Sequence, residues 1–156
     1  MPKVYALQTD IVWQDRSQNC QRVAELLTQS PPQPGSILVP PEMFDVGFTM
    51  KSAIANDGPA GETWTFCSEL ARTHQCAVLA GFARPNALGR VANVATFFDA
   101  SGRELARYEK THPFNVAGEG LYYAAGNGPA VFEWDGIKVA PVICYDLRFP
   151  ELFRMA

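Results

Sequence analysis

The sequence predicts an α/β fold, with one domain over residues 1–156 built on a mixed sheet. Apolar runs of strand length alternate with helical patterns over the first half of the chain, which indicates parallel strands joined by helices. From Arg90 onward the strands follow one another in pairs across short turns, which is typical of antiparallel hairpins. We therefore expect a sheet that is parallel at first and antiparallel later, with helices on one face.

The first elements are a strand, a helix and a second strand. Residues 3–9 predict the first strand. Asp15 begins a capping-box pattern, and apolar residues from Cys20 onward recur at helical spacing, which predicts a helix that runs to about Ser30. Residues 37–39 are all apolar, as in a strand that is covered on both faces.

A second helix and a buried strand come next. A proline-rich connector at residues 31–35 separates them from the first helix, since proline cannot continue a helix. Residues 62–73 place apolar side chains on one helical face, and residues 76–82 form another apolar run. The pattern over this part of the chain therefore predicts strand, helix and strand on one sheet.

Two hairpins complete the pattern. Residues 91–98 pair with 104–109 across a short polar turn. Residues 130–134 pair with 137–143 across an Asp-Gly turn, which is the strongest short hairpin signal in the chain.

The composition limits the classes of partner. The formal net charge is −3, and Lys and Arg form no basic stripe, which excludes a nucleic-acid surface. No apolar run approaches membrane-spanning length, and the first residues lack the pattern of a signal peptide. We expect a cytoplasmic protein that binds neither nucleic acid nor membrane.

The four cysteines predict free thiols, because the chain has no Cys-x-x-Cys pair and is expected in a reducing compartment. Cys67, His74 and Cys76 are close in sequence, but a structural zinc site needs a fourth ligand. The sequence therefore predicts neither a metal nor a cofactor.

Three chemically competent residues follow predicted strands: Glu42, Lys110 and Cys144. The carboxyl ends of strands in an open α/β sheet form the crevice where ligands bind, so we expect the three side chains to converge there. Cys144 ends an apolar run and precedes a helix begun by Pro150. The partial positive charge of a helix N-terminus favours a thiolate, so the sequence predicts an activated thiol at Cys144.

Such a trio can hydrolyse a carbon–nitrogen bond. A thiolate adds to an amide carbonyl carbon or a nitrile carbon, and it needs a base, an acid and donors for the oxyanion. Glu42 is the candidate base and acid, Lys110 supplies positive charge, and the backbone N–H of Tyr145 completes the oxyanion hole. The alternatives are solvated charges at Glu42 and Lys110, and a Cys144 that is a buried apolar residue or pairs with a histidine.

Three segments resemble the signature segments of the nitrilase superfamily of carbon–nitrogen hydrolases: PPEMF at residues 40–44, YEKTHPF at 108–114 and ICYDLRFPEL at 143–152. Their order and spacing match the Glu-Lys-Cys triad of that superfamily. The resemblance implies Glu42, Lys110 and Cys144 as catalytic residues, a small-molecule amide as substrate, and the N-terminal portion of a four-layer α-β-β-α sandwich.

A narrower resemblance covers residues 42–50 and 119–127, which are similar to the bacterial omega-amidase branch. Those enzymes hydrolyse 2-oxoglutaramate and 2-oxosuccinamate to dicarboxylates and ammonia. The same resemblance implies that Glu119 is a second glutamate that positions Lys110 and the substrate amide. The alternative for Glu119 is a loop carboxylate in water.

Arg148 has two possible roles. It is a candidate partner for a substrate carboxylate, or it locks the nucleophile turn by pairing with Asp146 or Glu151. Two other readings of the whole chain stay open. One is a different member of the superfamily, a nitrilase or a carbamoylase, and the other is an inactive half-domain that acts as an assembly partner.

The resemblance also implies a chain that is incomplete at its C-terminus, because superfamily members continue beyond this length. A truncated enzyme, a natural short protein and a proteolysed protein are the three explanations, and we favour the first. One sheet face is then expected to be bare, and apolar faces of that size do not persist on monomers. We therefore expect a homo-oligomer, specifically a dimer.

Overall fold

A five-stranded sheet in the order β1-β2-β3-β4-β5 organises the computed structural model, which describes residues 2–156. The strands are β1 (Val4–Ala6), β2 (Ile37–Val39), β3 (Ala77–Pro85), β4 (Val91–Phe98) and β5 (Glu104–Glu109). Parallel pairing joins β1 to β2 and β2 to β3, and antiparallel pairing joins β3 to β4 and β4 to β5. The predicted mixed sheet, parallel at first and antiparallel later, is confirmed.

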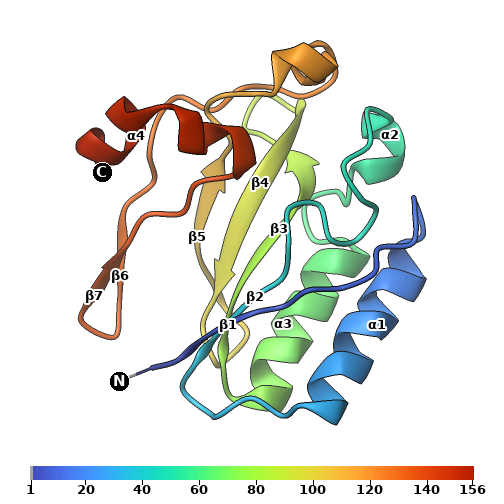
Figure 1. The fold of residues 1–156 in the computed structure, drawn as a ribbon, viewed down its shortest axis with the longest axis vertical. Coiled ribbons are helices and arrows are strands. Elements are labelled where there is room, and N and C mark those ends of the chain that lie inside the picture. The colour runs from blue at the N-terminus through green and yellow to red at the C-terminus, as the bar shows by residue number, and fades with distance from the viewer. Residues whose placement is uncertain (1) are drawn as a thin grey trace.

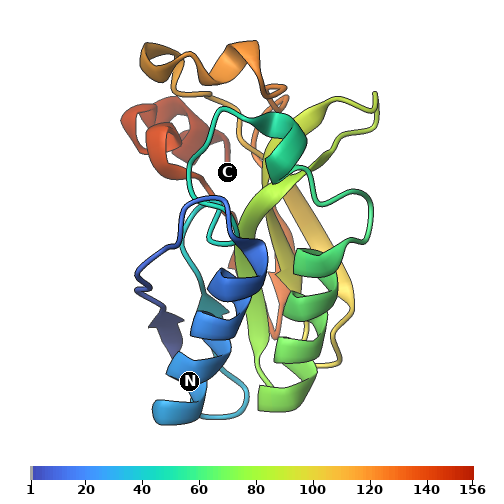
Figure 2. The ribbon, with the colours of Figure 1, turned by 90° about the vertical axis from the view of Figure 1, so that its right-hand side faces the viewer.

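Two helices cover one face of this sheet. They are α1 (Arg16–Gln29) and α3 (Glu62–His74), which lie side by side in front of the strands in Figure 2. The predicted N-cap of α1 is present, since the side chain of Asp15 accepts a hydrogen bond from Gln18 N. Apolar side chains from both helices and from β2, β3 and β4 form the main core, which includes Val23, Leu27, Leu38, Cys67, Ala71, Val78, Phe82 and Phe98.

A separate hairpin lies on the other face. Strands β6 (Phe132–Trp134) and β7 (Ile137–Val139) form a two-stranded sheet, seen to the left of the main sheet in Figure 1. The ring of Phe97 on β4 contacts Phe132 and Trp134 at centroid distances of 4.8 and 5.7 Å. These aromatic contacts attach the hairpin to the central sheet and add a further layer to the helices and the sheet.

Short helices occupy the remaining segments. They are α2 (Ser52–Ala55), the 3-10 helices η1 (Asn115–Ala117), η2 (Glu119–Leu121) and η3 (Cys144–Arg148), and the terminal α4 (Pro150–Met155). No helix among residues 2–156 is long and apolar enough to cross a lipid bilayer.

One strand prediction is wrong in a way that affects the site. Strand β7 ends at Val139 instead of running to Ile143, so Cys144 does not lie at the end of a strand. Pro141 lacks a backbone N–H and cannot continue a strand ladder. The chain therefore leaves the hairpin and passes alone across the sheet face, where Ile143 packs with Ala95, Tyr108 and Leu152. The short helix α2 was not predicted.

Two equivalent hairpin turns allow a matched test of packing. Gly89 and Gly102 have φ angles of 75° and 78°, and each donates its N–H to the residue three positions earlier. An alanine Cβ at Gly102 would lie 2.5 Å from the carbonyl oxygen of Ser68, whereas nothing lies within 4 Å of one at Gly89. We expect Gly89→Ala to cost about 1–2 kcal/mol in free energy of unfolding, from the left-handed backbone alone.

Gly102→Ala is expected to cost about 1–3 kcal/mol more than Gly89→Ala, because the added methyl group meets backbone. Urea unfolding of both variants measures the difference. Equal losses would mean that the β4–β5 turn can move away from α3 at no cost, which would contradict tight packing between them.

Candidate active site

Lys110 lies at the centre of a buried ionic cluster. Its Nζ is 2.8 Å from Oε1 of Glu42 and 2.9 and 3.2 Å from Oε2 and Oε1 of Glu119. The exposed fractions of the side chains are 1% for Lys110, 0% for Glu119 and 19% for Glu42. Glu42 and Lys110 follow β2 and β5, as predicted, and Glu119 opens η2. The structure thus brings three of the predicted residues into direct contact.

The carboxylates keep Lys110 charged. Burial lowers the pKa of Lys110, but the hydrogen bonds and charges of Glu42 and Glu119 outweigh that effect and raise it above its ordinary value. The ring of Phe48 lies 5.2 Å from the ammonium nitrogen, within the range of a cation–π contact. Glu119 is therefore no loop carboxylate in water; it is a buried partner of the ammonium group, and its Oε2 also accepts the N–H of Phe114 at 2.5 Å.

Asn93 of β4 joins the same cluster and was missed in the sequence. Its Nδ2 donates to Glu42 Oε1 at 2.7 Å and to Glu119 Oε1 at 3.0 Å. The only available signal was a polar side chain inside an apolar strand, and that signal does not say which partners the side chain meets.

Cys144 opens η3 with a left-handed backbone, at φ 46°. Cys144 is exposed, whereas Cys20, Cys67 and Cys76 are buried, and all four are free thiols. It lines a hollow of about 250 Å³ together with Glu42 and apolar residues, which include Pro41, Leu79, Ala95, Pro141 and Ile143. The thiol of Cys144 and the carboxylate of Glu42 thus line the same hollow.

The predicted activation of Cys144 by a helix dipole is wrong. Partial burial and the negative charge of Glu42 raise the pKa of the thiol, and Lys110 lowers it only in part. Cys144 begins a 3-10 helix of only five residues, and the helix that starts at Pro150 lies six residues further on. A raised thiol pKa favours the protonated thiol over the thiolate at neutral pH.

Asp146 braces the turn that bears Cys144 against the segment around Lys110. Its buried carboxylate accepts the hydroxyl of Tyr108 at 2.7 Å, the N–H of Ile143 at 3.1 Å, and both the N–H and the Nδ1 of His112 at 2.9 Å. Tyr108 and His112 lie two residues on either side of Lys110. This one carboxylate therefore sets the position of Cys144 relative to Lys110.

Neither predicted partner of Arg148 is found. Arg148 is exposed, and within residues 2–156 its side chain makes no ion pair or hydrogen bond. Asp146 is bound by Tyr108 and His112, and Glu151 pairs with Arg154 at 3.3 Å. The ring of Tyr145 packs between Phe114 and Phe149 at centroid distances of 5.0 and 5.4 Å. Its N–H belongs to the first turn of η3, where helical N–H groups have no partner within the helix.

The loop that carries Glu42 is held against β3. Gly81 lies so close that a Cβ there would be 3.0 Å from Cα of Glu42, and its carbonyl accepts Phe44 N. Further along, the buried Asp45 accepts hydrogen bonds from Arg16 at 3.0 Å and Thr63 at 2.9 Å. These contacts tie the loop to α1 and α3, so the position of Glu42 depends on the whole α/β core.

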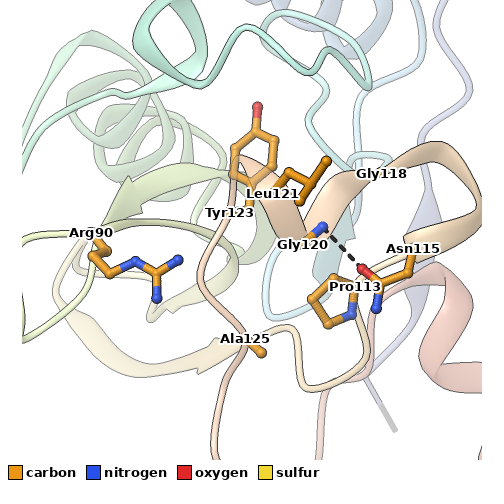
Figure 3. A pocket seen from close by; sticks show the side chains of 8 residues that line it. All are labelled: Arg90, Pro113, Asn115, Gly118, Gly120, Leu121, Tyr123 and Ala125. Carbon is orange, nitrogen blue, oxygen red and sulfur yellow. Dashed lines mark hydrogen bonds between the residues drawn. The ribbon is translucent and has the colours of Figure 1, made fainter.

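A second hollow, of about 600 Å³, lies beside the loop that bears Glu119. Figure 3 shows its lining, which consists of Arg90, Pro113, Asn115, Gly118, Gly120, Leu121, Tyr123 and Ala125. Asn115 Oδ1 accepts the N–H of Gly120 at 3.1 Å and stabilises the turn. None of Glu42, Lys110 and Cys144 lines this hollow, so it is not the candidate reaction site. Within residues 2–156, no three His, Cys, Asp or Glu side chains are arranged to hold a metal ion.

Comparison with known proteins identifies similar sequences. The family model for carbon-nitrogen hydrolases matches residues 3–156. The chain is 30% identical to the 2-oxoglutaramate amidase of Bacillus subtilis over 97% of its own length and 58% of that protein. It is 36% identical to an omega-amidase of Yersinia enterocolitica, over 97% of this chain and 57% of that one. The chain thus spans less than two thirds of these curated relatives.

Solved structures share the fold. A carbon-nitrogen hydrolase superfamily protein from Xanthomonas campestris, with an arsenic adduct in its active site, superposes with a TM-score of 0.85 and 26% identity. The match covers 95% of this chain and 55% of that one. A mutant amidase from Nesterenkonia sp. AN1, whose active-site cysteine has added acrylamide, gives a TM-score of 0.82 at 20% identity over 100% and 62% of the two chains.

The contribution of the Asp146 carboxylate to stability can be tested with two buried tyrosines. Tyr108 donates its hydroxyl to the Asp146 carboxylate, and Tyr123 donates to the backbone carbonyl of Thr49 at 2.6 Å. Hydrogen bonds to charged groups contribute about 1.5–3 kcal/mol and neutral ones about 1 kcal/mol. We expect Tyr108→Phe to lose about 2–3 kcal/mol and Tyr123→Phe about 1 kcal/mol of unfolding free energy in urea. A smaller loss for Tyr108→Phe than for Tyr123→Phe would contradict a brace.

The thiol chemistry predicts selective alkylation. Iodoacetamide is expected to modify Cys144 before the other cysteines, because burial shields them and raises the pKa of Cys20 to about 12. Since the pKa of Cys144 is itself raised, its reaction rate should climb with pH through values above about 8.5, the ordinary thiol pKa. Peptide mass spectrometry across pH 6–11 gives the profile. A rate that is already constant below pH 7 would rule out the protonated resting thiol.

Proposed function

The chain belongs to the carbon-nitrogen hydrolase family, and from this premise we propose that it is a cysteine-dependent amidase that cleaves small amides to a carboxylate and ammonia. The observation that carries the proposal is the contact of Lys110 with Glu42 and Glu119 beside the exposed thiol of Cys144. One nucleophile, one carboxyl base and one buried cation are the groups that acyl transfer from nitrogen requires.

Glu42 is the general base and acid of the proposed reaction. The protonated thiol of Cys144 gives its proton to the Glu42 carboxylate as Sγ adds to the amide carbonyl carbon. The same proton passes to the nitrogen as the carbon–nitrogen bond breaks, so ammonia leaves and a thioester to Cys144 remains. Glu42 then takes a proton from water, the hydroxide adds to the thioester, and the carboxylic acid leaves as the thiol reforms.

Lys110 and Tyr145 stabilise the oxyanion that forms on the carbonyl oxygen. Lys110 supplies a buried positive charge, which acts strongly because water is largely excluded from it. The N–H of Tyr145 supplies a hydrogen bond from the residue that follows the nucleophile. A donor in an oxyanion hole is worth roughly 3–4 kcal/mol of barrier.

The substrate we propose is a short 2-oxo dicarboxylate monoamide, as in omega-amidases. Two curated relatives bear omega-amidase or 2-oxoglutaramate amidase names. The hollow of about 250 Å³ between Glu42 and Cys144 is of a size for a small molecule. Arg148 remains the candidate for the remote carboxylate of the substrate, since its side chain is exposed and unpaired within residues 2–156.

We also propose that the protein forms a homodimer and acts in the cytoplasm. The proposed dimer would bury the β1 edge of the sheet, where Val4 is 67% exposed. Four unpaired thiols are typical of a reducing compartment.

Turnover of 2-oxoglutaramate by the purified chain tests the proposal, with ammonia release and the mass of an acyl adduct on Cys144 as readouts. Cys144→Ala should abolish both, and Glu42→Gln should lower turnover by roughly 100-fold to 10,000-fold, the usual contribution of a general base. Glu69→Gln, an exposed carboxylate on α3, is the matched control and should leave turnover unchanged.

The competing substrates give separate outcomes. Faster turnover of a nitrile or of an N-carbamoyl amino acid would assign the chain to another branch of the family. Neither ammonia nor an adduct from any of the three compounds, with a folded chain, would refute the amidase and favour an inactive half-domain.

A further inference from the structure

Asn93 lies inside the ionic cluster without carrying a charge. Its side chain is buried, and its Nδ2 bridges the two carboxylates by donating to Oε1 of Glu42 and Oε1 of Glu119. Its backbone carbonyl also accepts the N–H of Lys110 at 2.9 Å. Asn93 therefore contacts every charged member of the cluster, from strand β4, which is paired on both sides by β3 and β5.

We propose that Asn93 is a positioning residue, which orients the Glu42 carboxylate so that its second oxygen faces Cys144. This inference rests on the proposed function, because it assumes that Glu42 is the base for the thiol. Both donors to Glu42, the ammonium of Lys110 and the amide of Asn93, meet the same oxygen, Oε1. The remaining oxygen, Oε2, is the one left for the proton of Cys144.

The two donors constrain the Glu42 carboxylate in different ways. An ammonium group is a compact charge that rotates freely, so Lys110 holds the carboxylate near without fixing which oxygen it meets. A planar amide donates in a set direction, and the amide of Asn93 is held by two carboxylates at once. Lys110 thus keeps the Glu42 carboxylate close to the ammonium group, and Asn93 fixes the rotation of that carboxylate.

A buried atom without a partner supports this assignment. Within residues 2–156, Oδ1 of Asn93 is buried and accepts no hydrogen bond. Such an orphan acceptor is unfavourable, because it has lost its hydrogen bonds to water without gaining a partner. Reversing the amide would place Oδ1 against two carboxylate oxygens, which is worse. The side chain therefore keeps an unsatisfied carbonyl so that its amide nitrogen can meet both glutamates.

The pKa of the Cys144 thiol reports on the orientation of the Glu42 carboxylate. Partial burial raises the pKa of this thiol first, and then the charge and hydrogen bond of Glu42, while Lys110 lowers it and Glu119 raises it slightly. If Glu42 loses its fixed orientation, the carboxylate no longer faces the thiol as closely, and the thiol pKa falls toward its ordinary value. Turnover is not needed to see this change.

The test is the pH midpoint of Cys144 alkylation by iodoacetamide, measured by peptide mass spectrometry on the folded chain. Asn93→Ala is expected to lower the midpoint by about 1 pH unit, and Glu42→Gln to lower it by at least as much. In the Glu42→Gln background, Asn93→Ala should have no further effect, because the residue acts through Glu42. Slow reaction of Cys20, Cys67 and Cys76 reports that each variant is folded.

Thr96→Val is the matched control. Thr96 lies on the same strand, is fully buried, and its Oγ1 makes no hydrogen bond within the described residues. This change also removes a buried polar group from β4, and it should leave the midpoint unchanged. Asn93→Thr is a second variant, which suits a strand and fills more space than alanine but cannot bridge two carboxylates; it should lower the midpoint as Asn93→Ala does.

The outcomes separate the two proposals. An unchanged midpoint in Asn93→Ala with a lowered one in Glu42→Gln would overturn the role of Asn93 and leave Glu42 as the base. An unchanged midpoint in Glu42→Gln would refute the contact of Glu42 with the thiol, and the role of Asn93 with it. Loss of the folded state in both Asn93 variants, with Thr96→Val folded, would identify Asn93 as a structural residue.

Discussion

The burial of one ammonium group between two carboxylates is the constraint on which the site depends. Removing charges from water costs several kcal/mol for each ion, and only close partners offset that cost. Lys110 obtains them from Glu42 and Glu119, which belong to separate loops. The three loops must therefore reach one point together, or the chain would bury an uncompensated charge. Folding of the sheet and assembly of the candidate site are for this reason the same event.

A third carboxylate, that of Asp146, extends this order to Cys144. Asp146 binds residues on both sides of Lys110 and the residue just before Cys144. The stacked rings of His112 and Phe149, 3.7 Å apart, close the same turn from outside. Cys144 is not part of the ionic cluster, and its turn is too short to fix its own direction. The direction of the Cys144 side chain relative to Glu42 is therefore set by the contacts of neighbouring residues, chiefly Asp146.

The sequence predicts the α/β sheet and the residues that meet, but not the contacts that orient them. Strand and helix periodicities depend on burial, which local sequence patterns record, so the predicted α/β mixed sheet, parallel at first and antiparallel later, is confirmed. The end of β7 is mispredicted, because an apolar run that packs singly on a sheet resembles a strand in one dimension. Asn93 and Asp146 are missed as organising residues because their partners lie 26 to 51 and 34 to 38 positions away. No short-range pattern encodes such pairs.

The protonated thiol fits this arrangement better than a preformed thiolate would. The cluster holds two carboxylates and one ammonium group, so its net charge beside Cys144 is negative and opposes a second anion. A thiolate at rest would need a helix dipole or a histidinium. The helix η3 is only five residues long, and Cys144 at its start has a φ angle of 46°. Strained backbone of this kind costs of order 1–3 kcal/mol and persists only where surrounding contacts determine it. The Asp146 brace supplies those contacts, so the fold sets the direction of the Cys144 side chain, and the proposed mechanism leaves the thiol proton for Glu42 to remove.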